Sequence, residues 1–162
     1  MTNLLIVCAG NICRSPMAQV IIHQLATRGP LATPLAIDSA GTHAPMVTER
    51  MDPRARAALA RYRYEAGPLH SRRVSVHDCG HFDLIVAMDH RNLADLQRLC
   101  PVQHRHKLHL LMSFAPDLGE TIVPDPYYGN AAGFDNVIRL CEAGARGLLM
   151  HIRGTRLSDS AI

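Results

Sequence analysis

A short stretch near the start of the chain, VCAGNICRSP at residues 7–16, holds the residue types that a phosphate-transfer site needs. Cys8, Arg14 and Ser15 follow one another in the pattern C-x5-R-S. A cysteine thiolate is a strong nucleophile, and a guanidinium is a planar donor that can bind two oxygens of one phosphate. The pattern therefore predicts a cysteine that attacks a bound, tetrahedral and multiply charged anion.

The residues between Cys8 and Arg14 suit a loop that curls around such an anion. Gly10 permits unusual backbone angles, and Asn11 tolerates the left-handed region better than most residues. The successive N–H groups of such a loop point inward and form an anion site at the start of a helix. We therefore expect a phosphate-binding loop made of Cys8, Ala9, Gly10, Asn11, Ile12, Cys13, Arg14 and Ser15.

The same surroundings would activate Cys8. The loop amides, the positive end of the helix and Arg14 all favour a thiolate over a thiol. Ser15 can donate its hydroxyl to that thiolate and also help to cap the helix. Because these groups already supply a positive field, we expect neither a metal nor another cofactor.

The leaving oxygen of a phosphate ester also needs a proton, and Asp125 can supply it. This residue stands in VPDPYYG, at residues 123–129, between two prolines that restrict the backbone around it. We expect Asp125 to act first as a general acid. It would then act as the general base that activates the water which hydrolyses phosphocysteine.

The elements that position these residues alternate between strands and helices. Short apolar runs predict buried strands, and apolar residues at helical spacing predict helices. This alternation predicts an α/β fold of three layers, with a parallel sheet covered by helices on both faces. Cys8 would stand at the carboxyl end of the first strand, where ligands of such sheets bind. We expect strands within residues 4–10, 34–42, 82–89 and 107–114, and helices within residues 15–29, 52–63, 90–100 and 134–152.

Length and composition narrow the class of protein. The 162 residues predict a single domain over residues 1–162, whose last residues, from about 154, form a loose tail. A net charge of +3 without a run of Lys or Arg argues against a nucleic-acid partner. No segment approaches the roughly 18 apolar residues of a membrane span, and we expect no signal peptide.

The cysteines indicate the redox environment. There are five, Cys8, Cys13, Cys79, Cys100 and Cys141, an odd number at irregular spacing. This does not resemble the disulfide framework of a secreted protein. We therefore expect a reducing, cytoplasmic location in which a cysteine can remain a thiol.

Five motifs carry a resemblance to a known family. VCAGNICRSPMA (7–18), SAGT (39–42), DPRA (52–55), AMDHRNLADL (87–96) and PDPYYG (124–129) resemble those of the low-molecular-weight protein tyrosine phosphatases. Their order and spacing match over nearly the whole chain. The resemblance implies a four-stranded parallel sheet with flanking helices and metal-free hydrolysis of phosphotyrosine in protein substrates.

The resemblance also implies roles for single residues. Cys8 would be the nucleophile that forms phosphocysteine, Arg14 the phosphate clamp, and Asp125 the acid and base. Inorganic phosphate or another tetrahedral anion would bind in the loop. The residues that match the polar network which holds the family's loop are Asn11, Ser15, Ser39 and His70.

The rim of the site differs from the family pattern. Ile12, Tyr127 and Tyr128 are the expected rim residues. Family members often carry an aromatic residue in the loop after the SAGT segment, but this chain has none between Thr42 and Arg61. We expect a more open cleft on that side.

Cys13 stands one loop away from Cys8, and both thiols should lie near the same anion site. A low-pKa thiolate oxidises first, and a neighbouring thiol can trap it before irreversible over-oxidation. We therefore expect Cys13 to be the redox partner of Cys8.

Three other functions are compatible with parts of this pattern. A thiol-linked arsenate reductase would need two relay cysteines, but a predicted strand and helix separate Cys79 from Cys100. An arginine-phosphate phosphatase would favour threonine in place of Ile12. A non-catalytic phosphoprotein-binding module would not need the three catalytic residues. The histidines of HRHKLH, residues 104–109, could form a metal site, but a solvated loop is the expectation.

Overall fold

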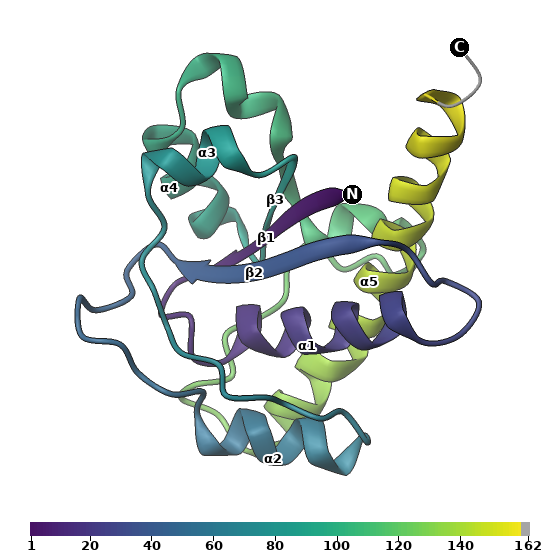
Figure 1. Ribbon diagram of the computed structural model, residues 1–162. Helices are drawn as coiled ribbons and strands as arrows, with labels where there is room; N and C mark the ends of the chain where they lie inside the picture. Colours follow the sequence, from purple (N-terminus) through teal and green to yellow (C-terminus); the bar gives the residue numbers. More distant parts are fainter. Residues whose placement is uncertain (160–162) are drawn as a thin grey trace.

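The computed structural model of the protein describes residues 1–159 and contains one sheet of four parallel strands (Figure 1). The strand order is β2-β1-β3-β4, and all three neighbouring pairs are parallel. The carboxyl ends of the strands therefore meet at one edge of the sheet, where the first strand ends at Cys8. The strands are β1 (Thr2–Cys8), β2 (Leu35–Gly41), β3 (Leu84–Ala87) and β4 (Leu108–Leu110).

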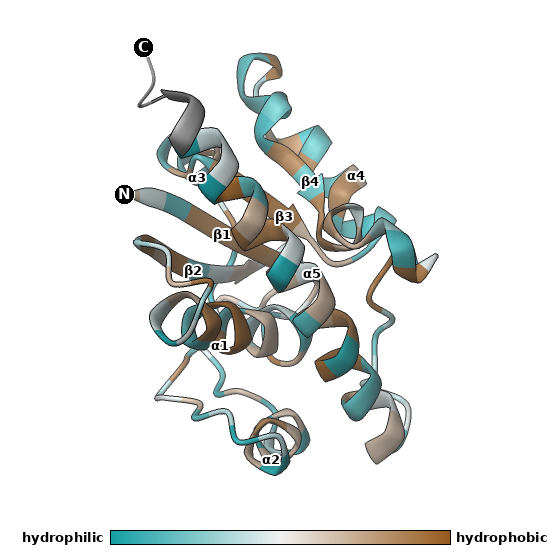
Figure 2. Cartoon of the chain, turned by 90° about the vertical axis from the view of Figure 1, so that its right-hand side faces the viewer, coloured by the Kyte–Doolittle hydropathy of each residue, from teal (hydrophilic) through white to brown (hydrophobic). Residues whose placement is uncertain are grey.

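Helices cover both faces of the sheet, which confirms the predicted three-layer α/β fold. One face carries α1 (Arg14–Thr27), α2 (Pro53–Arg61) and α5 (Ala131–Asp159), and the other carries α3 (Val76–His81) and α4 (His90–Leu99). Figure 2 shows that β1 and β3 are hydrophobic over most of their length. Short 3-10 helices complete the chain between α4 and α5: η1 (Val102–Lys107), η2 (Leu111–Phe114) and η3 (Pro116–Leu118).

The alternation of side chains along β1 divides the core in two. Leu4, Ile6 and Cys8 pack into the cluster beneath α1, α2 and α5, whereas Leu5 and Val7 pack into the cluster beneath α3 and α4. Successive residues of a strand point to opposite faces, so a central strand is apolar at each position that is buried, here residues 4–8 of β1. Cys8 is therefore directed toward the face that carries α1.

The structure corrects the prediction in three places. The strand expected within residues 107–114 is β4 for three residues and then turns into η2. The short helix α3 was not expected, because its sequence VHDCGH is too polar for an apolar period. The loose tail expected from about residue 154 is wrong as far as Asp159, because α5 continues to that residue. Residues 160–162 of that tail lie outside the described residues.

Contacts of Arg156 hold the last turns of α5 against the rest of the fold. Its guanidinium donates hydrogen bonds to Oγ1 of Thr2 at 3.0 Å and to the carbonyl of Pro34 at 2.8 Å. These contacts fasten the last turns of α5 to the beginning of β1 and to the segment before β2.

Within residues 1–159, no helix is long and apolar enough to cross a membrane.

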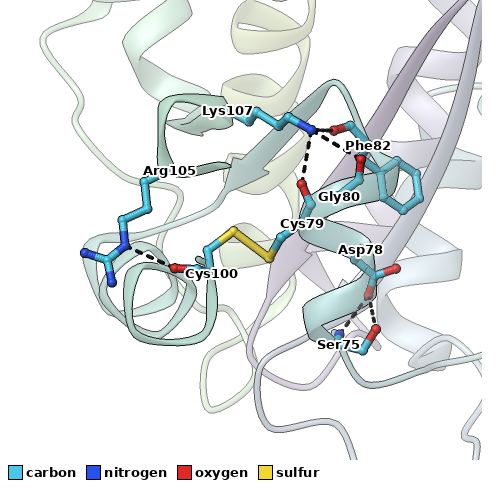
Figure 3. Close-up of a disulfide and its surroundings, with 8 residues drawn as sticks. All are labelled: Ser75, Asp78, Cys79, Gly80, Phe82, Cys100, Arg105 and Lys107. Atoms are coloured by element: carbon cyan, nitrogen blue, oxygen red, sulfur yellow. Dashed lines mark hydrogen bonds between the residues drawn. A yellow bond between two sulfur atoms is a disulfide. The ribbon is translucent and has the colours of Figure 1, made fainter. Parts of the chain in front are cut away.

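A disulfide joins Cys79 of α3 to Cys100, which directly follows α4 (Figure 3). The sequence analysis did not predict a disulfide, and only Cys8, Cys13 and Cys141 of the five cysteines are free. Both bonded residues are buried in the same core cluster. Parallel crossovers bring the two helix ends together, and spacing along the sequence does not reveal this.

Lys107 strengthens the same corner of the fold. Its Nζ donates to the carbonyls of Cys79 and Phe82 at 3.1 and 2.9 Å, at the end of α3 (Figure 3). A cation at this position satisfies carbonyls that a helix leaves without partners and favours the negative end of the helix dipole. The end of α3 is thus held by the disulfide and by the hydrogen bonds from the Lys107 ammonium.

Reduction of this disulfide should destabilise the protein. The bond closes a loop between residues 21 positions apart, which corresponds to about 3 kcal/mol of unfolding free energy in the chain-entropy account. Urea unfolding of the wild type with and without a phosphine reductant measures the difference. The Cys79→Ala/Cys100→Ala double variant should be equally stable in both conditions. A wild type whose stability ignores the reductant would contradict the prediction.

Candidate active site

The predicted phosphate loop occupies the turn between β1 and α1. Asn11 has a φ of 57°, the left-handed value that its residue type tolerates. Gly10, which was expected to take an unusual conformation, is not among the positive-φ residues, so Asn11 makes the turn instead. Helix α1 begins at Arg14, two residues earlier than a Ser15 cap would place it, and Cys13 occupies the N-cap position.

Two hydrogen-bond partners face the sulfur of Cys8. The backbone N–H of Asn11 donates to Sγ at 3.3 Å, and the hydroxyl oxygen of Ser15 lies 3.0 Å from Sγ. Cys8 is almost fully buried, with an exposed fraction of 3%. The sulfur is thus held at the base of the loop by one backbone contact and one side-chain contact.

The side chain of Asn11 holds the loop from inside. Its amide nitrogen donates to the hydroxyls of Ser15 and Ser39, both at 2.9 Å. Its carbonyl oxygen accepts the backbone N–H of Arg72 at 2.9 Å. The hydroxyl of Ser39 in turn donates to Oε1 of Gln19 at 2.6 Å. Three residues of the predicted network therefore lie together: Asn11, Ser15 and Ser39. The sequence analysis did not assign the other two partners, Gln19 and Arg72.

His70 does not lie in this network. It is exposed, and its backbone forms an isolated antiparallel bridge with Arg50. Within the described residues 1–159, no hydrogen bond joins its ring to the loop. The backbone of Arg72 takes the position beside Asn11, because the extended segment that follows His70 runs along the loop. The sequence stretch placed the segment correctly but assigned the wrong residue.

The residues after β2 brace the loop from outside. The N–H groups of Thr42 and His43 donate to the carbonyls of Cys8 and Ala9, each at 2.9 Å. Asp52 donates its N–H to the carbonyl of Ile12 at 2.8 Å. Because these three loop carbonyls are held by neighbouring segments, the loop is stiffened without using the N–H groups that an anion would need.

Arg14 is buried, with an exposed fraction of 3%, and is held by acceptors from other elements. Its Nη1 donates to Asp89 at 2.5 Å and to the carbonyl of Val123 at 3.0 Å. Nη2 lies 3.5 Å from Asp125. Burial alone would lower the pKa of Arg14, but the hydrogen bond to Asp89 and the surrounding negative charges outweigh it and raise that pKa above its ordinary value.

Asp89 is a site residue that the sequence analysis did not assign. It is the N-cap of α4, where its carboxylate accepts the N–H of Asn92 at 2.7 Å. The other carboxylate oxygen binds Arg14. The motif AMDHRNLADL contains Asp89, but its capping pattern does not reveal the second contact, which spans 75 positions in the sequence.

Asp125 and the expected rim residues come together above Cys8. They enclose a cavity of about 190 Å³. The Asp125 side chain is half exposed, and its Oδ1 accepts the N–H of Tyr127 at 3.1 Å. Tyr127 and Tyr128 contact each other edge to face, with ring centroids 5.0 Å apart. The lining residues are Cys8, Gly10, Ile12, Cys13, Arg14, Asp125, Tyr127 and Tyr128.

Cys13 lines the same cavity and remains a thiol. Burial, followed by the negative charges of Asp52, Cys8 and Asp125, raises its pKa to about 12. The two neighbouring cysteines are therefore in different electrostatic surroundings, since donors face Cys8 and carboxylates face Cys13.

Comparisons with known proteins place this site in a family. The model of the family described as low molecular weight phosphotyrosine protein phosphatase matches residues 3–158. The chain belongs to this family. A low molecular weight protein-tyrosine-phosphatase of Streptomyces coelicolor is 39% identical over 151 residues, which cover 91% of each chain. The crystal structure of a protein tyrosine phosphatase from Entamoeba histolytica has a TM-score of 0.91 at 34% identity, covering 96% of this chain and 99% of that one.

The alternative functions are not favoured for this phosphatase. Cys79 and Cys100 are bonded to each other in the core opposite to that of Cys8, so they are not placed to relay electrons to it. A solved arginine phosphatase, with a TM-score of 0.78 and 23% identity over 94% of this chain and 96% of that one, shares the fold alone. The binding-module alternative would leave the juxtaposition of Cys8, Arg14 and Asp125 without a purpose.

The histidine-rich stretch at residues 104–109 lies on η1 and β4 of the phosphatase. Within residues 1–159, no group of three or more His, Cys, Asp or Glu side chains is arranged to hold a metal ion. Burial, followed by the nearby His151 and His106, lowers the pKa of His109. This makes His109 a neutral, packed residue near neutral pH.

Gly41 leaves no room for a side chain beside the loop. A Cβ on this residue would lie 2.4 Å from the carbonyl oxygen of Ala9 and 3.0 Å from the N–H nitrogen of Asn11. Gly41→Ala should therefore displace the loop, lower the free energy of unfolding by about 1–3 kcal/mol and weaken competitive inhibition by inorganic phosphate.

Gly67→Ala is the matched control, because a Cβ there meets nothing within 4 Å. Urea unfolding and the phosphate inhibition constant measure both variants. Wild-type phosphate inhibition in the Gly41 variant would mean that the loop tolerates this displacement.

Proposed function

We propose that this phosphatase hydrolyses phosphotyrosine monoesters in proteins through a phosphocysteine intermediate on Cys8. The observation that carries the proposal is the single cavity in which a buried Cys8, the Arg14 guanidinium and the Asp125 carboxylate meet. A nucleophile, a phosphate ligand and a proton donor within one small cavity are the groups that phosphoryl transfer to a thiol needs.

In the first step the Cys8 thiolate attacks phosphorus while the bond to the tyrosine oxygen breaks. The loop N–H groups and Arg14 hold the three remaining oxygens, whose charge they stabilise. The electron pair of the breaking bond goes to the tyrosine oxygen, and protonated Asp125 transfers its proton there. The products are tyrosine and phosphocysteine.

In the second step water attacks phosphocysteine. Asp125, now a carboxylate, takes the proton of the attacking water, and the sulfur–phosphorus bond breaks. The electron pair returns to Cys8, where Ser15 and the N–H of Asn11 stabilise the departing thiolate. Inorganic phosphate is then released from the loop, and no cofactor is consumed.

The rim supports a preference for phosphotyrosine. Ile12 supplies an apolar wall and Tyr127 an aromatic ring beside Asp125. A phosphotyrosine ring between them would gain apolar burial and about 0.5–1.5 kcal/mol of aromatic contact. Phosphoserine is too short to reach Cys8 from the surface without drawing its own backbone into the cavity.

Anion binding and location extend the proposal. The Entamoeba histolytica structure is described with Hepes in its active site, and Hepes carries a tetrahedral sulfonate, which supports inorganic phosphate as a ligand of this loop. We propose phosphotyrosine proteins as partners, no nucleic-acid partner, and a cytoplasmic location. Disulfides are uncommon in reducing compartments, so the Cys79–Cys100 bond counts against the cytoplasmic part of this proposal.

Matched peptides that carry phosphotyrosine, phosphoserine or phosphoarginine test the proposal. We expect kcat/KM for phosphotyrosine to exceed that for the other two by about 100-fold or more. Cys8→Ser should fall below about a hundredth of wild-type turnover while still binding phosphate, because the loop survives without the thiolate. Comparable values on phosphotyrosine and phosphoserine would sink the substrate assignment, and an active serine variant would sink the nucleophile.

Mild peroxide should inactivate the phosphatase reversibly. The Cys8 thiolate would give its electron pair to peroxide and become a sulfenic acid with release of hydroxide. The thiol of Cys13 would then form a disulfide with release of water. Because burial and Asp52 hold the pKa of Cys13 near 12, its thiolate fraction, and with it the rate of disulfide formation, should rise about tenfold per pH unit near neutrality.

Mass analysis after mild peroxide treatment at two pH values measures the Cys8–Cys13 bond, with Cys13→Ser as the control. A dithiol reductant should restore activity to the wild type. Persistent sulfinic acid on Cys8 without a cross-link would show that Cys13 is a buried packing residue instead.

A further inference from the structure

We propose that Arg54 is a positioning residue that fastens the segment carrying Asp125 to the phosphate loop. This inference rests on the proposed function, in which Asp125 is the proton donor. Arg54 does not line the cavity of the site. It stands at the beginning of α2 and bridges two segments that are both in contact with the reacting groups.

On the loop side, Arg54 forms an ion pair with Asp52. Its Nε donates to Oδ1 at 3.1 Å, and Nη2 donates to Oδ2 at 2.9 Å, which is the paired geometry that a guanidinium favours. Asp52 is itself joined to the phosphate loop, because its N–H donates to the carbonyl of Ile12 at 2.8 Å. Arg54 is thus anchored to the loop through one intervening residue.

On the side of Asp125, Arg54 contacts Tyr127. Its remaining terminal nitrogen, Nη1, donates to the carbonyl of Tyr127 at 2.9 Å, and the guanidinium lies 5.2 Å from the centre of the Tyr127 ring. The N–H of Tyr127 donates to Oδ1 of Asp125 at 3.1 Å. The backbone of residue 127 therefore binds Arg54 at its carbonyl and the proton donor at its N–H.

The position of Asp125 depends on this connection. Its side chain is half exposed, with an exposed fraction of 49%, so packing does not fix it. Besides the N–H of Tyr127, the carboxylate has the contact with Arg14 at 3.5 Å, which is too long for a strong hydrogen bond. Movement of Tyr127 would thus be passed directly to the carboxylate.

The Arg54 guanidinium also lies near a second aromatic ring, that of Phe134. Its carbon lies 5.0 Å from the centre of the Phe134 ring, at the start of α5. Phe134 is buried in the main core cluster, so the bridge is attached to a rigid part of the fold. Arg54 itself belongs to the stretch between Thr42 and Arg61, which lacks an aromatic residue.

The test compares two aryl esters in the same enzyme preparation. Phenyl phosphate has a poor leaving group that needs a proton, and 2,4-dinitrophenyl phosphate has a good leaving group that does not. Arg54→Met keeps the aliphatic stem but removes all three donors. We expect its kcat/KM for phenyl phosphate to fall about tenfold, because a displaced acid transfers its proton poorly, while the dinitrophenyl ester and inhibition by inorganic phosphate change by less than about twofold.

Two variants make this result specific. Arg54→Lys should lose as much as Arg54→Met, because an ammonium cannot bind Asp52 and Tyr127 in the same geometry. Arg56→Met is the matched control on the same helix. Arg56 also donates to two backbone carbonyls, those of Ala66 and Gly67, which lie away from the cavity, so its ratio between the two esters should equal that of the wild type.

The Asp125→Ala variant separates this inference from the proposed function. It should lose about 100-fold on phenyl phosphate and much less on the dinitrophenyl ester, and adding Arg54→Met should cause no further change in the ratio. Equal losses on both esters in Asp125→Ala would refute the acid itself. An acid-like Asp125→Ala together with an unchanged ratio in Arg54→Met would overturn the positioning role alone. Because the ratio is independent of the amount of folded enzyme, a poorly folding variant still decides the question.

Discussion

The burial of the Arg14 guanidinium constrains the arrangement of the whole site. A cation removed from water costs several kcal/mol unless charged or polar partners surround it. Asp89 supplies the charge from the start of α4, and the carbonyl of Val123 supplies a second acceptor. The N–H of Val123 is itself bonded to the carbonyl of Met88, one residue before Asp89. One buried cation thus requires that β3, α4 and the segment leading to Asp125 meet at the end of β1.

The phosphate loop is stiff for a related reason. Asn11 adopts a left-handed conformation that few residues accept, and its buried amide satisfies partners on three sides. Arg72, whose N–H completes this set, uses its guanidinium to bind Asp78 at the start of α3. Burial would raise the pKa of Asp78, but hydrogen bonds from Arg72 and Ser75 outweigh it and lower that pKa below its ordinary value. The loop is therefore tied to α3 on one face of the sheet and to α1 on the other.

The sequence predicted those parts whose physical causes are local. The apolar run of β1, the C-x5-R-S pattern and the prolines around Asp125 are each contained within a few residues. The structure brings Cys8, Arg14 and Asp125 together as expected. The sequence did not predict the roles of Asp89 and Arg54 or the Cys79–Cys100 disulfide. The partners of these residues are distant in the chain and are brought near by the parallel crossovers. His70 was expected in the loop network, but the backbone N–H of Arg72, two residues later, is the group that binds Asn11.

The two halves of the site differ in how firmly they are held, and this difference suits the chemistry. The loop and Arg14 are buried, so the anion site exists before substrate arrives and needs little reorganisation when charge develops. Asp125 is half exposed and is held through the backbone of Tyr127. A group that must give a proton to one oxygen and then take a proton from a water near the same place needs solvent access and some freedom of movement. The acid is accordingly attached by a small number of surface contacts, whereas the anion site is built from buried groups.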